Sequence, residues 1–110
     1  MDQVIFRDLR RDINKHLFNM AYKVRNLQEG SRPGNWIRYW EDATGQKAGT
    51  CHYCGCTDKA TDGSHVQLAD SMNRKWYIVP LCHRHNCQYG QTFWVDGPLV
   101  GVADSSDILW

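Results

Sequence analysis

Apolar residues recur at every third or fourth position through the first 28 residues, which is the spacing of one face of an α-helix. The periodic positions are Ile5, Leu9, Ile13, Leu17, Met20, Val24 and Leu27. Asp2 is a suitable N-cap, and Gly30 begins a Gly- and Pro-containing stretch that is typical of a helix end. The pattern therefore predicts one amphipathic helix over residues 3–28, within an N-terminal unit of residues 1–34.

Beyond residue 34 the pattern changes to short segments of the kind found in β-strands. Aromatic and β-branched residues predict that Asn35–Glu41 is extended. The other expected elements are strands at Ser64–Leu68 and Trp76–Pro80, a short helix in Leu81–Gln88, and a hairpin in Phe93–Val102. We therefore expect an α+β fold in which residues 35–110 form a single structural unit.

The composition fits a globular protein, because 42% of the 110 residues are hydrophobic and 23% are charged. No apolar run is long enough to span a bilayer, so no membrane role is expected. The first residues lack the apolar core of a secretory signal, which predicts a cytoplasmic location. Cysteines are kept reduced there, so clustered cysteines indicate metal ligands or catalytic groups rather than disulfides.

Two clusters of such ligands stand out. The segment CHYCGC places three thiols within Cys51–Cys56, and the segment CHRHNC begins at Cys82. Paired clusters of this kind are typical of a zinc site, in which a tight turn supplies two thiolates and the first turn of a helix supplies two more ligands. Cys82 and His85 are three residues apart and would share a helix face.

The fourth ligand has two candidates. Cys51, Cys82 and His85 are the expected ligands, and Cys54 or Cys56 completes the set. The spacing to Cys51 and the following glycine favour Cys54 on physical grounds. A structural Zn²⁺ contributes roughly 10–16 kcal/mol of apparent folding free energy. We therefore expect the fold of the C-terminal two thirds to depend on the ion.

Charge is unevenly distributed along the chain. Residues 1–38 hold eight Lys or Arg against four Asp or Glu, whereas the remainder is net acidic. Basic side chains that could contact the phosphates of nucleic acid are Arg7, Arg10, Arg11, Lys15, Lys23 and Arg25, with Arg74, Lys75 and Arg84 further along. The N-terminal helix could also pair with a second copy of itself.

Residues 51–88 resemble the zinc-bearing HNH domains, which have a treble-clef or ββα-metal fold. The resemblance rests on Cys51-x2-Cys54, on Gly63-Ser64-His65-Val66, and on the segment Tyr77–Asn86 that contains Cys82-x2-His85. It implies a strand, loop, strand and helix in that order. It also implies that the short helix carrying Arg84 meets the DNA minor groove.

A closer resemblance is to small uncharacterised bacterial and phage-type proteins with C-x4-C, GAHV and YIVPLC-x2-CN motifs. Cys51-x4-Cys56, Gly63–Val66 and Tyr77–Asn86 follow that pattern, with His85 at the place of its last cysteine. This resemblance favours Cys56 as the fourth ligand. Cys54 and Cys56 therefore remain alternatives for one position.

The resemblance to HNH domains also implies catalytic positions. His65 matches the general base, and Asn86 matches a ligand of a catalytic divalent ion such as Mg²⁺. Tyr77 stands where the family has an Asn, and Ser64 stands where it has an acidic residue, so the centre is degenerate. We expect a zinc-stabilised module that recognises nucleic acid by binding.

Two other functions are alternatives. One is a metal-dependent HNH-type endonuclease or nickase that uses His65 and Asn86. The other is a phage or mobile-element protein that binds a host protein through aromatic anchors. The candidate anchors are Trp36, Tyr39, Trp40, Trp76, Phe93 and Trp94.

Overall fold

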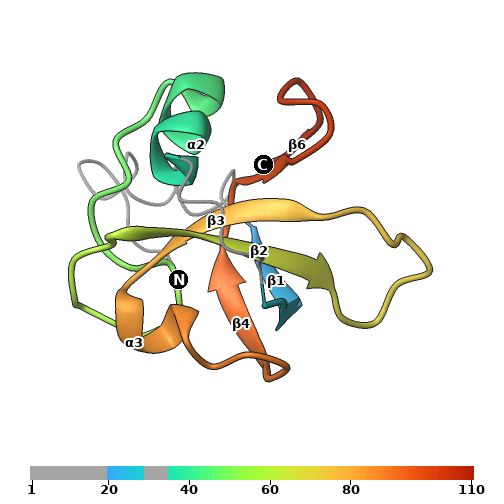
Figure 1. Cartoon of the computed structure of the whole chain (residues 1–110), viewed down its shortest axis with the longest axis horizontal. Helices are drawn as coiled ribbons and strands as arrows, with labels where there is room; N and C mark the ends of the chain where they lie inside the picture. Colours follow the sequence, from blue (N-terminus) through green and yellow to red (C-terminus); the bar gives the residue numbers. More distant parts are fainter. Residues whose placement is uncertain (1–19, 29–34) are drawn as a thin grey trace, which may run out of the picture.

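The computed structural model describes residues 20–28 and 35–110, which form a six-stranded antiparallel sheet with two helices (Figure 1). The strands are β1 (Ala21–Asn26), β2 (Asp62–Leu68), β3 (Tyr77–Leu81), β4 (Thr92–Asp96), β5 (Leu99–Gly101) and β6 (Ile108–Leu109). The helices are α2 (Trp36–Thr44) and α3 (His83–Asn86). Within the sheet the strand order is β4-β1-β2-β3-β5-β6.

The predicted N-terminal helix is wrong where the structure can test it. Ala21–Asn26 forms β1, which pairs with β2 on one side and β4 on the other. Its exposure alternates, with Val24 fully buried and Lys23 and Arg25 exposed. Met20 and Val24 are four residues apart, a separation that keeps side chains on one face of a helix and of a strand alike. Residues 3–19 of the prediction lie outside the described residues.

The predicted strand Asn35–Glu41 is instead the N-terminal part of α2. The Asn35 side chain accepts a hydrogen bond from the Arg38 backbone at 3.1 Å and caps the helix, and Gly45 ends it in the left-handed conformation with φ of 72°. Trp36 and Trp40 are one helical turn apart, and Trp40 is fully buried. The aromatic residues therefore follow the helical period and pack α2 against the sheet.

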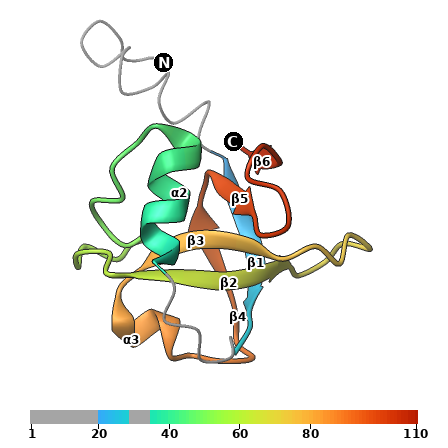
Figure 2. The same ribbon diagram turned by 45° about the horizontal axis from the view of Figure 1, so that its top comes forward.

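The sheet separates two apolar clusters. The first lies on the concave side of the curled sheet and contains Val24, Val66, Tyr77, Val79, Leu81, Phe93, Val95 and Leu99 together with Cys51 and Cys82. The second lies between the sheet and α2 and contains Trp40, Ala48, Ala60, Ile78 and Val100. Figure 2 shows α2 on one side of the β2–β3 pair and α3 on the other.

The strands predicted at Ser64–Leu68 and Trp76–Pro80 are confirmed as β2 and β3, and the short helix after them as α3. The C-terminal hairpin is not formed as predicted. Both of its strands exist, but β4 pairs with β1, and β5 pairs with β3 and β6. The two strands separate because their hydrogen-bonding partners are different strands, and these partners lie far away in the sequence, where local signals do not identify them.

Neither of the helices in residues 35–110 combines the length and the apolar character that crossing a membrane requires.

Gly63 on β2 allows the first turn of α2 to lie directly on the sheet. A methyl group there would come within 2.6 Å of the backbone carbon and Cβ of Trp36. We therefore expect Gly63→Ala to lower the free energy of unfolding by about 1–3 kcal/mol, the usual cost of overpacking. Chemical denaturation would measure the change. Gln67→Ala on the same strand is the control and should change stability by less than about 0.5 kcal/mol; equal effects would contradict the steric explanation.

Candidate metal centre

Four side chains from the two sequence clusters meet at one end of the sheet. The thiols of Cys51, Cys56 and Cys82 and a ring nitrogen of His85 all lie within 4.8 Å of one another. Cys51, Cys82 and His85 are buried, and Cys56 is partly buried. None of the five cysteines, all of which lie in the described part of the chain, forms a disulfide. The group could hold a metal ion.

The distances within this group suit tetrahedral coordination. Nδ1 of His85 lies 3.3 Å from Sγ of Cys82 and 3.7 Å from Sγ of Cys51. A sulfur and a nitrogen bound to the same tetrahedral Zn²⁺ lie roughly 3.5 Å apart, given bonds of about 2.3 and 2.0 Å. Three thiols and one imidazole are also the soft donor set that zinc prefers. The residues therefore fit zinc without rearrangement of the backbone.

A tight turn at residues 51–56, here called the ligand turn, lies against β4 and carries two of the four candidate ligands, Cys51 and Cys56. The backbone N–H of Cys56 donates to the Tyr53 carbonyl at 2.9 Å, and Gly55 takes a φ of 91° that suits glycine. Tyr53 forms a bridge to Val95, so the turn lies along the edge of β4. The Asp58 backbone N–H lies 3.4 Å from Sγ of Cys56. This turn therefore both presents thiols and covers a sheet edge.

The end of β3 and the start of α3 supply the other two ligands. Cys82 is the N-cap residue of α3, and His85 lies one turn later on the same side. The Asp62 carboxylate on β2 holds this helix through His83 Nδ1 and Asn86 Nδ2, each at 2.8 Å. Sequence reasoning did not identify Asp62 as an anchor, because its partners lie more than 20 residues away along the chain.

The ring of His85 is also held in place. It stacks on Tyr53 with ring centroids 3.7 Å apart and an interplanar angle of 4°. Tyr53 in turn packs against Phe93 of β4. The ligand turn thus supplies both a thiol pair and the surface that orients the imidazole, so the site is preorganised.

Burial sets the protonation of the ligands. It raises the pKa of the Cys51 thiol to about 12, an effect only partly offset by hydrogen bonds from the backbone of Cys82 and Tyr53. Burial, followed by the adjacent Arg84 guanidinium, lowers the pKa of His85 and favours the neutral imidazole that a metal needs. An ion must therefore displace a proton from the buried Cys51 thiol, and metal affinity should fall as pH is lowered.

The two remaining cysteines lie outside the four-donor group. Sγ of Cys54 lies 3.6 Å from a carboxylate oxygen of Asp96, and Sγ of Cys87 lies 3.4 Å from Nε2 of His83. Burial, followed by the charge of Asp96, raises the pKa of the Cys54 thiol to about 11. The structure therefore groups Cys56, and not Cys54, with the other three donors.

The positions implied by the HNH resemblance are separated by the sheet: His65 is on β2 and faces α2, whereas Asn86 is on α3, which lies against the opposite face of β2. His65 packs against Trp36 of α2 with ring centroids 4.8 Å apart. Asn86 instead accepts a hydrogen bond from Ser64 and donates one to Asp62. Ser64 and His65 are neighbours on β2 and point to opposite faces. Asn86 lies on the Ser64 side, so the structure does not bring it together with His65.

The predicted basic residues fall into separate places. Arg7, Arg10, Arg11 and Lys15 lie outside the described residues. Lys23 and Arg25 are on β1, and Arg74 and Lys75 are in the β2–β3 loop. Arg84 is on α3, at the opposite end of β3 from that loop, and pairs with Asp58 at 3.0 Å. Arg84 therefore lies apart from the other four described basic residues, so the nine predicted positions are not shown to share one surface.

The chain matches no model of a known protein family, and comparisons with curated proteins and with solved structures give no match either.

The two cysteines of the ligand turn give a matched pair of variants. We expect Cys56→Ser to abolish stoichiometric zinc binding and cooperative unfolding, because it removes one of the four grouped donors. Cys54→Ser should keep both, with a stability change of less than about 0.5 kcal/mol. Elemental analysis and thermal melts would measure these outcomes. If Cys54→Ser lost zinc and Cys56→Ser kept it, Cys54 would be the fourth ligand instead.

A second variant tests the anchor on β2. Asp62→Asn should weaken zinc binding by about tenfold, since residues that orient ligands typically contribute that much to metal affinity. Competition with a chelating dye would measure the affinity. Asp70→Asn, at the far end of the same strand pair, is the control and should bind zinc as the parent does. Equal affinities for all three proteins would show that Asp62 does not position α3.

Proposed function

We propose that this chain is a zinc-stabilised binding module whose ion is structural and whose partner is nucleic acid. The observation that carries the structural assignment is the closed donor set of Cys51, Cys56, Cys82 and His85. Catalytic zinc sites usually have three protein ligands and leave one position for water, whereas structural sites have four. Four donors, three of them buried, favour the structural role.

The ion would join two parts of the chain that are distant in sequence and that also meet through the hydrogen bond from the His52 N–H to the Pro80 carbonyl and the stacking of Tyr53 on His85. Cys51 and Cys56 precede β2, whereas Cys82 and His85 follow β3. A structural Zn²⁺ is worth roughly 10–16 kcal/mol of apparent folding free energy, comparable to the whole stability of a small domain of about 5–15 kcal/mol. Binding of the partner should therefore require the zinc-loaded fold.

Exposed basic side chains support nucleic acid as the partner. Lys23 and Arg25 project from β1, and the sequence adds Arg7, Arg10, Arg11 and Lys15 in the segment before it. Lys23 pairs with Asp70 at 3.3 Å, but both side chains are largely exposed. Ion pairs of this kind contribute little to stability, so a phosphate group can replace the carboxylate.

Binding is favoured over cleavage for a specific reason. An HNH-type nuclease needs its base and its metal ligand beside the same phosphate. His65 packs against Trp36 of α2 on one side of β2, whereas Asn86 belongs to α3 and bonds to Ser64 on the other side. Asn86 also forms hydrogen bonds with Ser64 and Asp62, and these bonds anchor α3.

A host protein is the other candidate partner, with exposed aromatic residues as its contacts.

The proposal predicts zinc- and salt-dependent retention of nucleic acid. The purified zinc-loaded chain should bind a mixed pool of short labelled DNA and RNA at low salt, and binding should weaken steeply as salt rises. Chelation should abolish binding together with the cooperative thermal transition. Salt-independent binding, or no binding by the folded protein, would contradict nucleic acid as the partner and favour a protein partner. A chain that stays fully folded after chelation would remove the structural role of zinc.

A further inference from the structure

We infer that the outer face of strands β4, β1 and β2 is a platform for single-stranded nucleic acid, with Trp94 stacking on a base and Arg25 contacting a phosphate. This inference rests on the proposed function and names the surface and the form of nucleic acid that it takes. The platform consists of Trp94 and Thr92 on β4, Lys23 and Arg25 on β1, and Gln67 on β2.

Strand alternation places these residues together. On β4, Phe93 and Val95 point into the concave core, so Trp94 points outward and is 52% exposed. On β1, Val24 points into the same core, so Lys23 and Arg25 share the outer face with Trp94.

The register of the strands makes the platform continuous. Lys23 lies directly opposite Trp94, and Arg25 lies between Thr92 on β4 and Gln67 on β2. Side chains on directly opposed residues lie about 5 Å apart, close enough to act on one ligand. The Arg25 guanidinium lies 3.4 Å from the Gln67 side chain, which orients it across the face.

The backbone around Trp94 is fixed on both sides. β1 pairs with one edge of β4, and the ligand turn covers the other, where the Cys54 N–H donates to the Trp94 carbonyl at 3.0 Å. A large exposed aromatic ring on rigid backbone loses little conformational freedom when a base stacks on it. The metal-bearing turn thereby supports the platform as well as the core.

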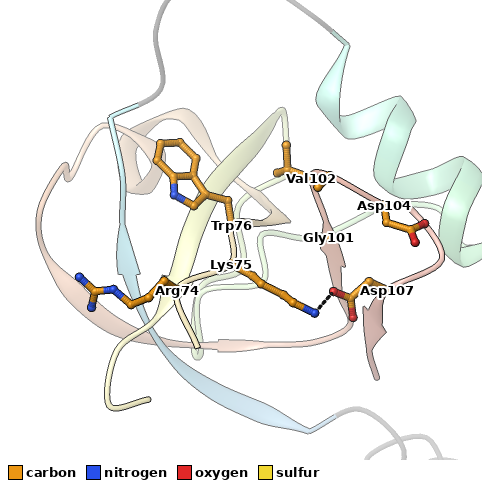
Figure 3. Close-up of a pocket in the computed structure, with 8 residues that line it drawn as sticks. Arg74, Lys75, Trp76, Gly101, Val102, Asp104 and Asp107 are labelled. Atoms are coloured by element: carbon orange, nitrogen blue, oxygen red, sulfur yellow. Dashed lines mark hydrogen bonds and ion pairs between the residues drawn. The ribbon is translucent and has the colours of Figure 1, made fainter. Parts of the chain in front are cut away.

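A second exposed tryptophan extends the platform. Trp76 is 41% exposed and lies just before β3, with its ring 6.0 Å from that of His65, a neighbour of Gln67 on β2. Beside Trp76 is a hollow of about 540 Å³. Figure 3 shows Trp76 and Arg74 on one side of this hollow and the ion pair between Lys75 and Asp107 on the other. An unstacked base has room there against an aromatic ring, in a hollow whose charged lining residues are Arg74, Lys75, Asp104 and Asp107.

Charge favours an anionic partner over an apolar one, and the exposed tryptophans favour a single strand over a duplex. Lys23 is paired with Asp70, and Asp96 lies at the end of β4, while Asp104 and Asp107 line the hollow together with Arg74 and Lys75. Arg25 has no ion pair among the described residues, so the strands of the platform carry a free cation next to Trp94. Tryptophan rings on a sheet offer stacking surfaces that only unpaired bases can use, because bases in a duplex are already stacked. The combination of basic side chains and exposed tryptophans therefore selects single strands.

The test uses the full zinc-loaded chain and fluorescence anisotropy with labelled single strands of DNA and RNA about a dozen nucleotides long, within the usual site size. Single strands should bind at least about tenfold more tightly than the matching duplex, as expected if stacking on unpaired bases contributes. Trp94→Ala should weaken binding by about tenfold, and Trp94→Phe should keep most of it. Trp110→Ala, which removes an exposed tryptophan beyond β6, is the control and should match the parent.

Arginine variants test the phosphate contact. Arg25→Ala should reduce the slope of log affinity against log salt by about 0.7, the value for one phosphate on a single strand. Arg38→Ala, at an exposed position on α2, should leave the slope unchanged. Duplex preference, or binding that is unaffected by both Trp94→Ala and Arg25→Ala, would overturn the platform while leaving the proposed function intact. Absence of binding to every nucleic acid would overturn both.

Discussion

The proposed role of this chain depends on one interaction: a metal ion that would join two distant pieces of backbone. Cys51 and Cys56 come from a turn before β2, and Cys82 and His85 come from the junction of β3 and α3. A chain of 110 residues buries roughly two thirds of its unfolded surface, so its stability is modest and a bound ion would add substantially to it. The ligand turn also packs Tyr53 against His85 and β4. An ion bound there would therefore link the ring stacking and the sheet edge into one unit.

The same unit connects stability to the surface that we assign to binding. The ligand turn covers one edge of β4, and β4 carries Trp94 on its outer side. The inner side of β4 closes the core through Phe93 and Val95. An ion bound at the candidate metal centre would thus order the backbone that carries the exposed Trp94 ring, through the contacts of β4 with the ligand turn.

The ligand chemistry could be predicted from the sequence because few roles need cysteines and histidines in paired clusters. The competing predictions for the fourth ligand shared a short turn, and local spacing does not determine which thiol faces inward. Only the docking of that turn on β4, which leaves Cys54 beside Asp96, separates Cys54 from Cys56.

The errors in the predicted fold have physical causes of the same kind. Met20 and Val24 satisfy both helical and strand periodicity, so pairing with β2 and β4 decided the outcome for β1. The segment that became α2 has three helix signals: Asn35 as N-cap, Gly45 as C-cap, and Trp36 and Trp40 one turn apart. The prediction gave more weight to its β-prone residues and was therefore wrong. Partners of β4 and β5 are non-local and were not encoded in the turn between them.

The most direct test of the central claim is X-ray absorption spectroscopy at the zinc edge on the purified chain. The account predicts a four-coordinate ion with three sulfur neighbours at about 2.3 Å and one nitrogen neighbour at about 2.0 Å. A protein that contains no bound transition metal, or an ion with water or carboxylate oxygen in its coordination sphere, would contradict it.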